Sequence, residues 1–394
     1  MSLFAGIRVL DLSRVMSGPY CTALLADLGA EVIKLETPGS GDDSRRFGPF
    51  VNGASLYFAL LNRGKKSVAL NLKHARARSL AQQLAGQADV VVENFRPGVA
   101  ARLGLDYATL GPSQPRLIYL SISGFGQRGP FAARPAYDLI VQAMSGIMSI
   151  TGQADGPPTA IGESLADVAT GMFGAFAIAS ALFERSCSGR GRHIDLAMFD
   201  SLIAMQLTAL SRLWATGTAP ERVGNRHPVT TPVDCFRAAD GLVAIVVPSD
   251  AHFRRLCAIM KQAQLADDAR FRDNASRAQH EAELKALIEQ WSTGLPVEDL
   301  IAQCGKADIP AGPVWDLKQA AGSEHANARS LFSRVAHPAF GTLNYPPQPA
   351  RFSALAAPTP AREPLLGEHT REVLRERLAL ADAELDQLAR DGAI

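Results

Sequence analysis

The chain has 394 residues, and its 40 Lys and Arg against 39 Asp and Glu give a formal net charge of +1. A hydrophobic content of 47% with 20% charged residues is ordinary for a globular protein and excludes a disordered or fibrous chain. The near-neutral balance argues against a nucleic-acid-binding surface, which usually carries a basic excess. An anionic ligand must therefore be met by a local cluster of cations.

The cysteines and histidines indicate neither a disulfide framework nor a metal centre. The five cysteines include no C-x-x-C pair, which favours reduced thiols in a cytoplasmic protein. The eight histidines include no H-x-x-x-H pair. The N-terminus lacks a basic segment before a long apolar core, and the most apolar uncharged run, 168–183, is shorter than the about 20 residues of a membrane span. We therefore expect a buried helix in a soluble protein that does not contact a membrane.

Strands and helices alternate through the first half of the chain. A strand over 7–12 precedes a break at 17–19, a helix over 20–28 that Gly29 ends, and a strand over 30–36. The alternation continues with strands over 67–72, 89–95 and 117–123 and a helix over 74–86. This order predicts an α/β fold whose mostly parallel sheet is covered by helices on both faces.

Helical spacing dominates the next part of the chain. The pattern predicts helices over 138–150, 164–185 and 199–213, with a strand over 193–197. A polar stretch over 216–232 is typical of a domain linker. Beyond it the sequence predicts a hairpin over 234–247, turned at Asp240-Gly241, and then helices over 252–264, 277–293 and 368–379.

The first strand–helix turn does not favour a dinucleotide site. A Rossmann fingerprint needs G-x-G-x-x-G, in which each glycine has its own steric task. The turn over 14–20 contains one glycine, Gly18.

Asp167 stands at the mouth of the predicted helix over 164–185 and allows two interpretations. With Ser164 three residues before it, Asp167 fits a capping box, and a carboxylate there also favours the positive end of the helix dipole. Spacing alone favours this capping role. Small neighbours, among them Gly162 and Gly171, would also leave the carboxylate accessible to a bulky thioester, toward which it could act as a covalent nucleophile.

Four cations are candidates for a phosphate clamp, because each follows a predicted strand or lies in a short loop, where α/β sheets bind ligands. For any one of them alone, a solvated surface charge is the simpler interpretation. Tyr137 is either a buried aromatic or a hydrogen-bond donor over a substrate. The four cations are Lys73, Arg96, Arg102 and Arg134.

Ten short motifs in order make the chain resemble the family III CoA-transferases, the group that contains formyl-CoA transferase and carnitine CoA-transferase. The resemblance covers nearly the whole chain. It includes the strings Val-Leu-Asp-Leu at 9–12, Gly-Ala-Glu-Val-Ile-Lys-Leu-Glu at 29–36, Val-Glu-Asn-Phe-Arg-Pro-Gly at 92–98, Gly-Phe-Gly-Gln-Arg-Gly-Pro at 124–130 and Leu-Gly-Glu-His-Thr at 366–370.

The resemblance implies a CoA-transferase in which Asp167 matches the family's nucleophilic aspartate. An acyl-CoA donor, with succinyl-CoA a candidate, would pass CoA to a carboxylic acid through aspartyl anhydride and aspartyl-CoA thioester intermediates. CoA and acyl-CoA are then substrates, and no permanently bound cofactor is expected. Around the acyl group the resemblance places Met16, Ser17 and Tyr137, where Met16 and Ser17 replace a glutamine and an alanine of some members. The strings that contact CoA in the family, with Arg134 added from the cations above, give Leu70, Lys73, Asn94, Phe95, Arg96, Arg102 and Arg134.

The resemblance also implies the domain organisation. It predicts a large Rossmann-like α/β domain over 1–215, a smaller α+β domain over 225–325, and a segment over 330–394 that returns to the large domain. Two such chains interlock in the family, so a homodimer with little stable free monomer is expected. Several relatives carry an arginine where Thr37 and Pro38 stand, so another basic residue must compensate.

Two alternatives stay open at this point. The same fold hosts α-methylacyl-CoA racemases, whose catalytic histidine precedes an aspartate that aligns with Asp138. Tyr137 occupies that position, and a tyrosine with an ordinary pKa of about 10 is a poor base at neutral pH. The second alternative is a non-catalytic acyl-CoA-binding protein, against which the presence of Asp167 argues.

Overall fold

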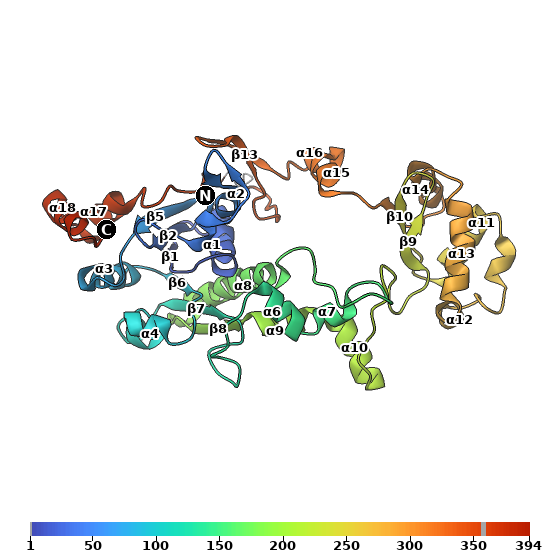
Figure 1. Cartoon of the computed structure of the whole chain (residues 1–394), viewed down its shortest axis with the longest axis horizontal. Coiled ribbons are helices and arrows are strands. Elements are labelled where there is room, and N and C mark those ends of the chain that lie inside the picture. The colour runs from blue at the N-terminus through green and yellow to red at the C-terminus, as the bar shows by residue number, and fades with distance from the viewer. Residues whose placement is uncertain (1, 356–359) are drawn as a thin grey trace. The chain divides into compact units, whose positions relative to one another are not determined.

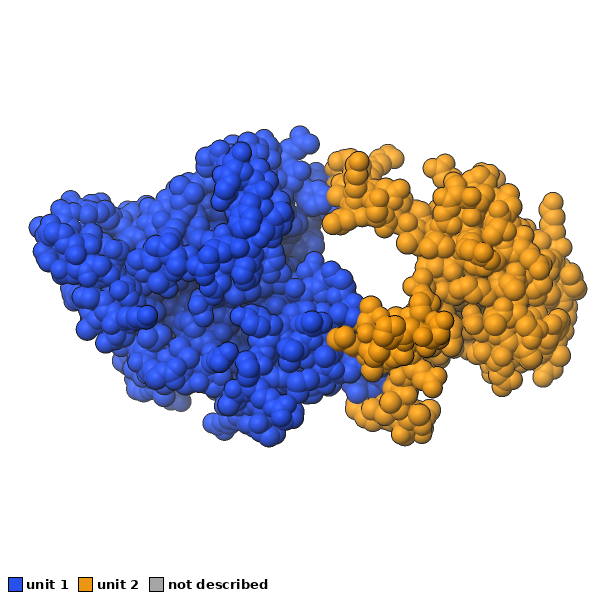
Figure 2. Space-filling model, viewed as in Figure 1, with its two compact units in different colours: residues 1–147, 160–210, 329–394 blue, residues 148–159, 211–328 orange. Residues whose placement is uncertain are grey.

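The computed structural model describes residues 2–355 and 360–394. The chain divides into two compact units, shown in separate colours in Figure 2. Unit 1 comprises residues 1–147, 160–210 and 329–394, and unit 2 comprises residues 148–159 and 211–328. The domain limits inferred from the sequence stay a prediction.

Unit 1 is built on a six-stranded sheet in the order β5-β2-β1-β6-β7-β8 (Figure 1). Every neighbouring pair in it is parallel, which confirms the sheet predicted from the alternation of strands and helices. Four consecutive residues of β6 are fully buried, as expected for strands covered on both faces. The strands are β1 (Arg8–Asp11), β2 (Glu31–Glu36), β5 (Lys65–Ala69), β6 (Val90–Glu93), β7 (Ile118–Ser123) and β8 (His193–Ala197).

The C-terminal helices pack against the first half of the chain. In Figure 1, α17 (Thr370–Leu378) and α18 (Asp382–Arg390) lie beside α3 (Ala75–Ala85) and β5, and α17 contacts both. The backbone N–H of Asn71 donates to the carbonyl of Ala393 at 2.9 Å. Leu374 and Leu385 are fully buried in the same core cluster as Val68 and Leu80.

The longest helix of unit 1, α8 (Leu165–Ser188), packs against α1 (Ser17–Asp27). Gly171 permits the close approach, because a Cβ there would lie 2.9 Å from the Ser17 carbonyl oxygen. The opposite face of α8 is exposed, with Phe176 72% and Phe183 74% accessible. Within the single chain, therefore, only one face of the expected buried helix is buried, and the other apolar face is exposed.

Within the described residues, α8 is also the one helix that is long and apolar enough to cross a membrane by length and composition. Its buried face belongs to the core of unit 1, where Ala169, Gly174 and Ile178 are buried. Arg185, near its end, forms a 3.0 Å ion pair with Asp89. These contacts are those of a core helix.

Two predicted helices are each divided in the structure. The predicted helix over 138–150 forms α6 (Asp138–Met144) and α7 (Ile147–Ile150), because Gly146 takes a φ of +85° and leaves the helical conformation. The predicted helix over 199–213 forms α9 (Met198–Met205) and α10 (Leu207–Thr216), divided at Gln206, whose ψ of 42° is not helical.

Shorter elements complete unit 1. They are η1 (Asp43–Arg46), β3 (Phe50–Val51), β4 (Ala54–Ser55), α2 (Leu56–Asn62), α4 (Val99–Leu103), α5 (Tyr107–Leu110), η2 (Gly111–Ser113), β12 (Ser333–His337) and β13 (Gly341–Tyr345).

Unit 2 contains a three-stranded antiparallel sheet in the order β11-β10-β9. The predicted hairpin at Asp240-Gly241 is confirmed, since it joins β9 (Val233–Arg237) to β10 (Leu242–Val246). Phe236 and Ile245 of this sheet are buried against the helices. The remaining elements are β11 (Ala311–Pro313), α11 (Asp250–Ile259), η3 (Ala263–Ala266), α12 (Asn274–Gln279), α13 (Glu281–Ser292), α14 (Val297–Lys306), α15 (Leu317–Gly322) and α16 (Glu324–Ala328).

Candidate active site

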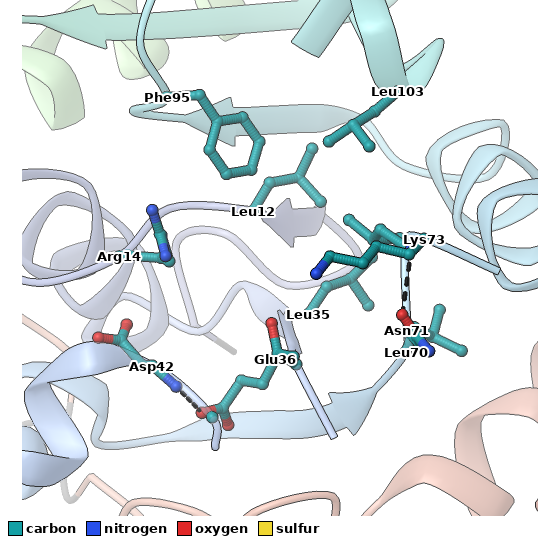
Figure 3. A pocket seen from close by; sticks show the side chains of 13 residues that line it. Leu12, Arg14, Leu35, Glu36, Asp42, Leu70, Asn71, Lys73, Phe95 and Leu103 are labelled. Carbon is teal, nitrogen blue, oxygen red and sulfur yellow. Dashed lines mark hydrogen bonds between the residues drawn. The ribbon is translucent and has the colours of Figure 1, made fainter. Parts of the chain in front are cut away.

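Two cavities open beyond the carboxyl ends of the parallel strands of unit 1, which is where open α/β sheets bind their ligands. The first, here called the leucine cavity, has a volume of about 200 Å³ and is drawn in Figure 3. The second, the Asp167 cavity, has a volume of about 270 Å³. The leucine cavity is lined by Leu12, Arg14, Leu35, Glu36, Thr37, Gly41, Asp42, Leu70, Asn71, Leu72, Lys73, Phe95 and Leu103.

Asp167 lies in the first turn of α8 and does not serve as its cap. The Ser164 side chain makes no capping hydrogen bond, so the expected capping box is wrong. Instead the Ala166 N–H donates to Asp138 Oδ1 at 2.7 Å, and Gln142 Nε2 donates to Asp138 Oδ2 at 2.7 Å. A carboxylate from α6 therefore caps α8, and the Asp167 carboxylate is left for another task.

Burial and, to a smaller extent, the nearby negative charge of Asp138 raise the pKa of Asp167 to about 6. Hydrogen bonds from the side chain and backbone of Ser17 act in the opposite direction. At neutral pH the group is mostly ionised but poorly solvated. An anion in that condition is a better nucleophile than a fully hydrated carboxylate, and perturbed carboxylates in a cavity are typical of active sites.

The turn that brings Ser17 to Asp167 is strained and is held from beneath by buried charges. Val15 has a φ of +68°, which a β-branched residue rarely adopts. Its N–H donates to Asp42 Oδ1 at 3.1 Å, and Asp42 Oδ2 forms a 2.7 Å ion pair with Lys34 Nζ. Lys34 Nζ also donates to the Ser13 carbonyl at 2.8 Å. One buried ion pair therefore contacts both sides of the turn.

A second buried ion pair supports the end of β1. Lys65 Nζ lies 3.0 Å from Asp11 Oδ2, and both side chains are inaccessible to solvent. Thr22 Oγ1 donates to the same carboxylate at 2.7 Å. Burial alone would raise the pKa of Asp11, but Lys65 and Lys34 hold it at about 2. The Asp11 carboxylate thus stays ionised near neutral pH, while burial lowers the pKa of Lys65 to about 8.

The structure brings most of the predicted site residues to the two cavities. Leu70 and Lys73 line the leucine cavity, and Phe95 lines both cavities. Met16 is buried and lines neither cavity, and Arg102 is exposed on α4 and also lines neither. The remaining six line the Asp167 cavity: Ser17, Asn94, Arg96, Arg134, Tyr137 and Asp167.

Sequence reasoning missed Arg14, which lines both cavities. Its place directly after the first strand, where α/β sheets bind ligands, is the signal that identifies it. It also missed the paired lysines and aspartates beneath the turn, because charged residues inside strands give no pattern of their own.

No metal site is found among residues 2–355 and 360–394, where no three His, Cys, Asp or Glu side chains group to hold an ion.

Comparison with known proteins places this site in a family. The sequence model of CoA-transferase family III matches residues 4–370. The chain is 45% identical to an acetyl-CoA:oxalate CoA-transferase from Acetobacter aceti over 90% of each chain, and 40% identical to a succinate–glutarate CoA-transferase from Agrobacterium fabrum over 94% of this chain and 95% of the relative. The crystal structure of a CAIB/BAIF family protein from Brucella suis matches with a TM-score of 0.85 at 36% identity, covering 95% of this chain and 99% of that one. The chain belongs to CoA-transferase family III, and it is an enzyme that uses CoA thioesters as substrates.

Proposed function

We propose that this enzyme transfers CoA from a small acyl-CoA to a small dicarboxylic acid, with Asp167 as the nucleophile. The observation that carries the proposal is the state of Asp167: a largely buried carboxylate, ionised at neutral pH, in contact with Ser17 and facing a cavity at the carboxyl ends of the strands. Arg96 and Arg134 line the same cavity and offer cations for an anionic substrate.

The exchange proceeds through covalent steps on Asp167. A carboxylate oxygen attacks the thioester carbonyl carbon, a C–O bond forms, and the C–S bond breaks as CoA leaves as the thiolate. The thiolate then attacks the Asp167 carbonyl carbon, so that an aspartyl-CoA thioester forms and the donor acid departs as its carboxylate. The acceptor carboxylate attacks this thioester and displaces the CoA thiolate, which leaves an anhydride between the acceptor and Asp167. The thiolate then attacks the acceptor's acyl carbon in this anhydride, so that acceptor-CoA forms and the Asp167 carboxylate is restored.

Hydrogen-bond donors beside Asp167 are needed at each step, because every addition places negative charge on a carbonyl oxygen. The Ser17 hydroxyl and N–H are the donors that already interact with the carboxylate. Removing one such donor from other enzymes costs about 2.7–4 kcal/mol of transition-state stabilisation. Ser17 is therefore the first candidate for stabilising the oxyanion.

The leucine cavity suits the nucleotide end of CoA. Its wall is mainly apolar, with Leu12, Leu35, Leu70 and Phe95 available to contact a flat base. Lys73 lies at the same wall and is exposed, so it is free to meet a phosphate. In Figure 3 the Lys73 side chain reaches into the cavity from the side opposite Arg14.

The substrate pair is tested by incubating the purified enzyme with acetyl-CoA or succinyl-CoA and a panel of carboxylic acids, with product CoA esters read by mass spectrometry. We expect transfer to small dicarboxylates such as oxalate or glutarate, the acids named for the relatives. In a second experiment, hydroxylamine is added to enzyme that has received acyl-CoA alone. Hydroxylamine should convert Asp167 to a hydroxamate, which peptide mass spectrometry detects. A hydroxamate at another carboxylate, with none at Asp167, would reject the nucleophile assignment.

The proposal includes a homodimer. The exposed face of α8 carries Met172, Phe173, Phe176 and Phe183, and the neighbouring α6 exposes Leu139 and Ile140. Exposed large apolar side chains on two packed helices are typical of a surface that a second subunit covers. Sedimentation velocity should give twice the 42.0 kDa chain mass, whereas a monomer at micromolar concentration would contradict the dimer.

A further inference from the structure

The chemistry of CoA sets a requirement that the two cavities must meet. This inference rests on the proposed function, in which the thioester lies at Asp167 and the nucleotide base lies in the leucine cavity. CoA joins its pantetheine arm to its nucleotide through a diphosphate, which carries negative charge. The diphosphate must therefore lie where the two cavities share a wall.

Two residues form that shared wall, Arg14 and Phe95. Phe95 carries no charge. Among the cations that line either cavity in the described part of the chain, Arg14 alone lines both, since Lys73 belongs to one and Arg96 and Arg134 to the other. Figure 3 shows Arg14 across the leucine cavity from Lys73.

The backbone of Arg14 is fixed in place by Asn94. The Arg14 N–H donates to Asn94 Oδ1 at 2.8 Å, and Asn94 Nδ2 donates to the Arg14 carbonyl at 2.7 Å. This pair of hydrogen bonds ties the loop after β1 to the loop after β6. The base of the arginine side chain is therefore held at the shared wall whatever its guanidinium contacts.

The guanidinium itself is held weakly. Its Nη1 lies 3.2 Å from Asp43 Oδ2, with the two side chains 54% and 36% accessible, and exposed ion pairs of this kind stabilise little. Asp43 has a second partner, because Arg46 Nη2 lies 2.6 Å from its other oxygen. When the Arg14 guanidinium moves away, the Asp43 carboxylate therefore keeps Arg46 as an ion-pair partner. A diphosphate offers the planar guanidinium a bidentate acceptor of higher charge.

We propose that Arg14 binds the diphosphate of CoA at the junction of the two cavities, and that Asp43 holds its guanidinium in the free enzyme. Arg14 would thereby supply the cation whose need was inferred from Thr37 and Pro38.

The test is titration of CoA into the full-length enzyme by calorimetry. Arg14→Gln should weaken CoA binding by about ten- to hundred-fold, since it removes a charge-assisted pair of hydrogen bonds. The matched control is Arg192→Gln. Arg192 is 59% accessible and pairs with one surface carboxylate, Glu184 at 2.7 Å, but it precedes β8 and so lies at the opposite edge of the sheet. Its loss should change CoA affinity by less than about twofold, because a distant exposed charge is screened.

Truncated ligands identify which group Arg14 contacts. Dephospho-CoA lacks the 3′-phosphate but keeps the diphosphate, so Arg14→Gln should weaken its binding as much as that of CoA. Acetyl-pantetheine lacks both, so its affinity should be the same for both proteins. Arg14→Lys, which keeps the charge but not the bidentate geometry, should fall between wild type and Arg14→Gln, and it provides the same test if the glutamine variant does not fold.

Each contrary result has a distinct meaning. Equal CoA dissociation constants for wild type and Arg14→Gln would overturn the inference while leaving the proposed function intact. An effect that disappears with dephospho-CoA would assign Arg14 to the 3′-phosphate and overturn the diphosphate contact. A wild-type enzyme that binds no CoA would reject the proposed function and this inference with it.

Discussion

The aspartates near the turn that holds Val15 fall into two groups. Their surroundings shift the pKa of the carboxyl group in opposite directions. Asp11 and Asp42 are fully buried yet each forms an ion pair with a buried lysine, and the pKa of Asp11 is lowered to about 2. Asp167 is less buried and has no cation partner of this kind; its charged neighbour is another carboxylate, Asp138, and its pKa is raised to about 6. In Asp11 the two lysines and the hydrogen bonds outweigh the effect of burial, whereas in Asp167 burial, with Asp138 adding to it, raises the pKa.

This difference in pKa indicates that the ion-paired aspartates support the backbone, whereas Asp167 is suited to a chemical role. The paired carboxylates keep one charge state across the working pH range, which suits the support of a strained backbone. Among the described residues no lysine forms an ion pair with Asp167, which agrees with the nucleophilic role proposed for it. Such a group lowers stability, and that is a common property of active-site residues.

Replacing Asp167 by Asn should have the largest effect. The amide keeps the size of the side chain but cannot attack a thioester, so CoA transfer should fall by at least about 10⁴-fold. Initial transfer rates of the two proteins, with matched circular dichroism spectra, measure this. The control is Glu163→Gln, on the exposed residue that precedes the helix. A well-folded Asp167→Asn enzyme with near-normal turnover would remove Asp167 from the chemistry.

Removing one member of the buried Lys65–Asp11 ion pair should lower the stability of the fold. Lys65→Met leaves the Asp11 carboxylate buried without its main partner, and such changes cost about 3–5 kcal/mol of unfolding free energy. Urea denaturation at pH 7.5 measures the loss. The double variant Asp11→Asn, Lys65→Met should recover part of it, because the uncompensated charge is gone. A loss below about 1 kcal/mol in the single variant would mean that the pair is not a support.

The pH dependence should follow Asp167 and not Asp11. Below its pKa of about 6 the proposed nucleophile Asp167 is protonated, so the formation of the aspartyl-CoA thioester from acyl-CoA should fall about tenfold per pH unit. Stopped-flow measurement of this half-reaction requires no acceptor acid, so the protonation of the acceptor does not interfere.

One further buried carboxyl titrates nearby and needs a control. Burial raises the pKa of Glu93 to about 7, and its Oε2 accepts from the Phe95 N–H at 2.8 Å. Glu93→Gln keeps an acceptor at that position. The fall in rate near pH 6 should persist in this variant; if it vanished, Glu93 and not Asp167 would set the profile.

The smallest effect expected is a gain in stability on removing the Asp167 charge. Because the folded-state pKa is raised, the protonated carboxyl is compatible with the fold below the unfolded pKa of 3.8, and stability is lost as the pH rises through about 6. The Asp167→Asn variant should therefore unfold at a higher urea concentration at pH 7.5. Its free energy of unfolding should be larger by about 1–2 kcal/mol, after allowance for partial solvent access. At pH 4.5 the gain should shrink toward zero. An equal gain at both pH values would trace it to packing instead of charge.

The sequence alone determined the parts of this protein that depend on local pattern. Alternating apolar strands and helices predicted the parallel sheet, and the Asp240-Gly241 pair predicted the hairpin of unit 2. The ordered motifs predicted the family, and the helical spacing over 164–185 put Asp167 in the first turn of a helix. These signals can be recognised in the sequence because each depends on residues that are only a few positions apart.

Only the tertiary structure decided how the site is assembled. Asp138, from a different helix, took the capping role that the spacing gave to Ser164 and Asp167, because a carboxylate brought in by packing outcompeted the local partner. The junction at Arg14 arose because β1 and β6, far apart in the sequence, are neighbours in the sheet, so that their loops line two cavities together. Contacts of this kind join residues with no fixed spacing, and for that reason no pattern along the chain records them.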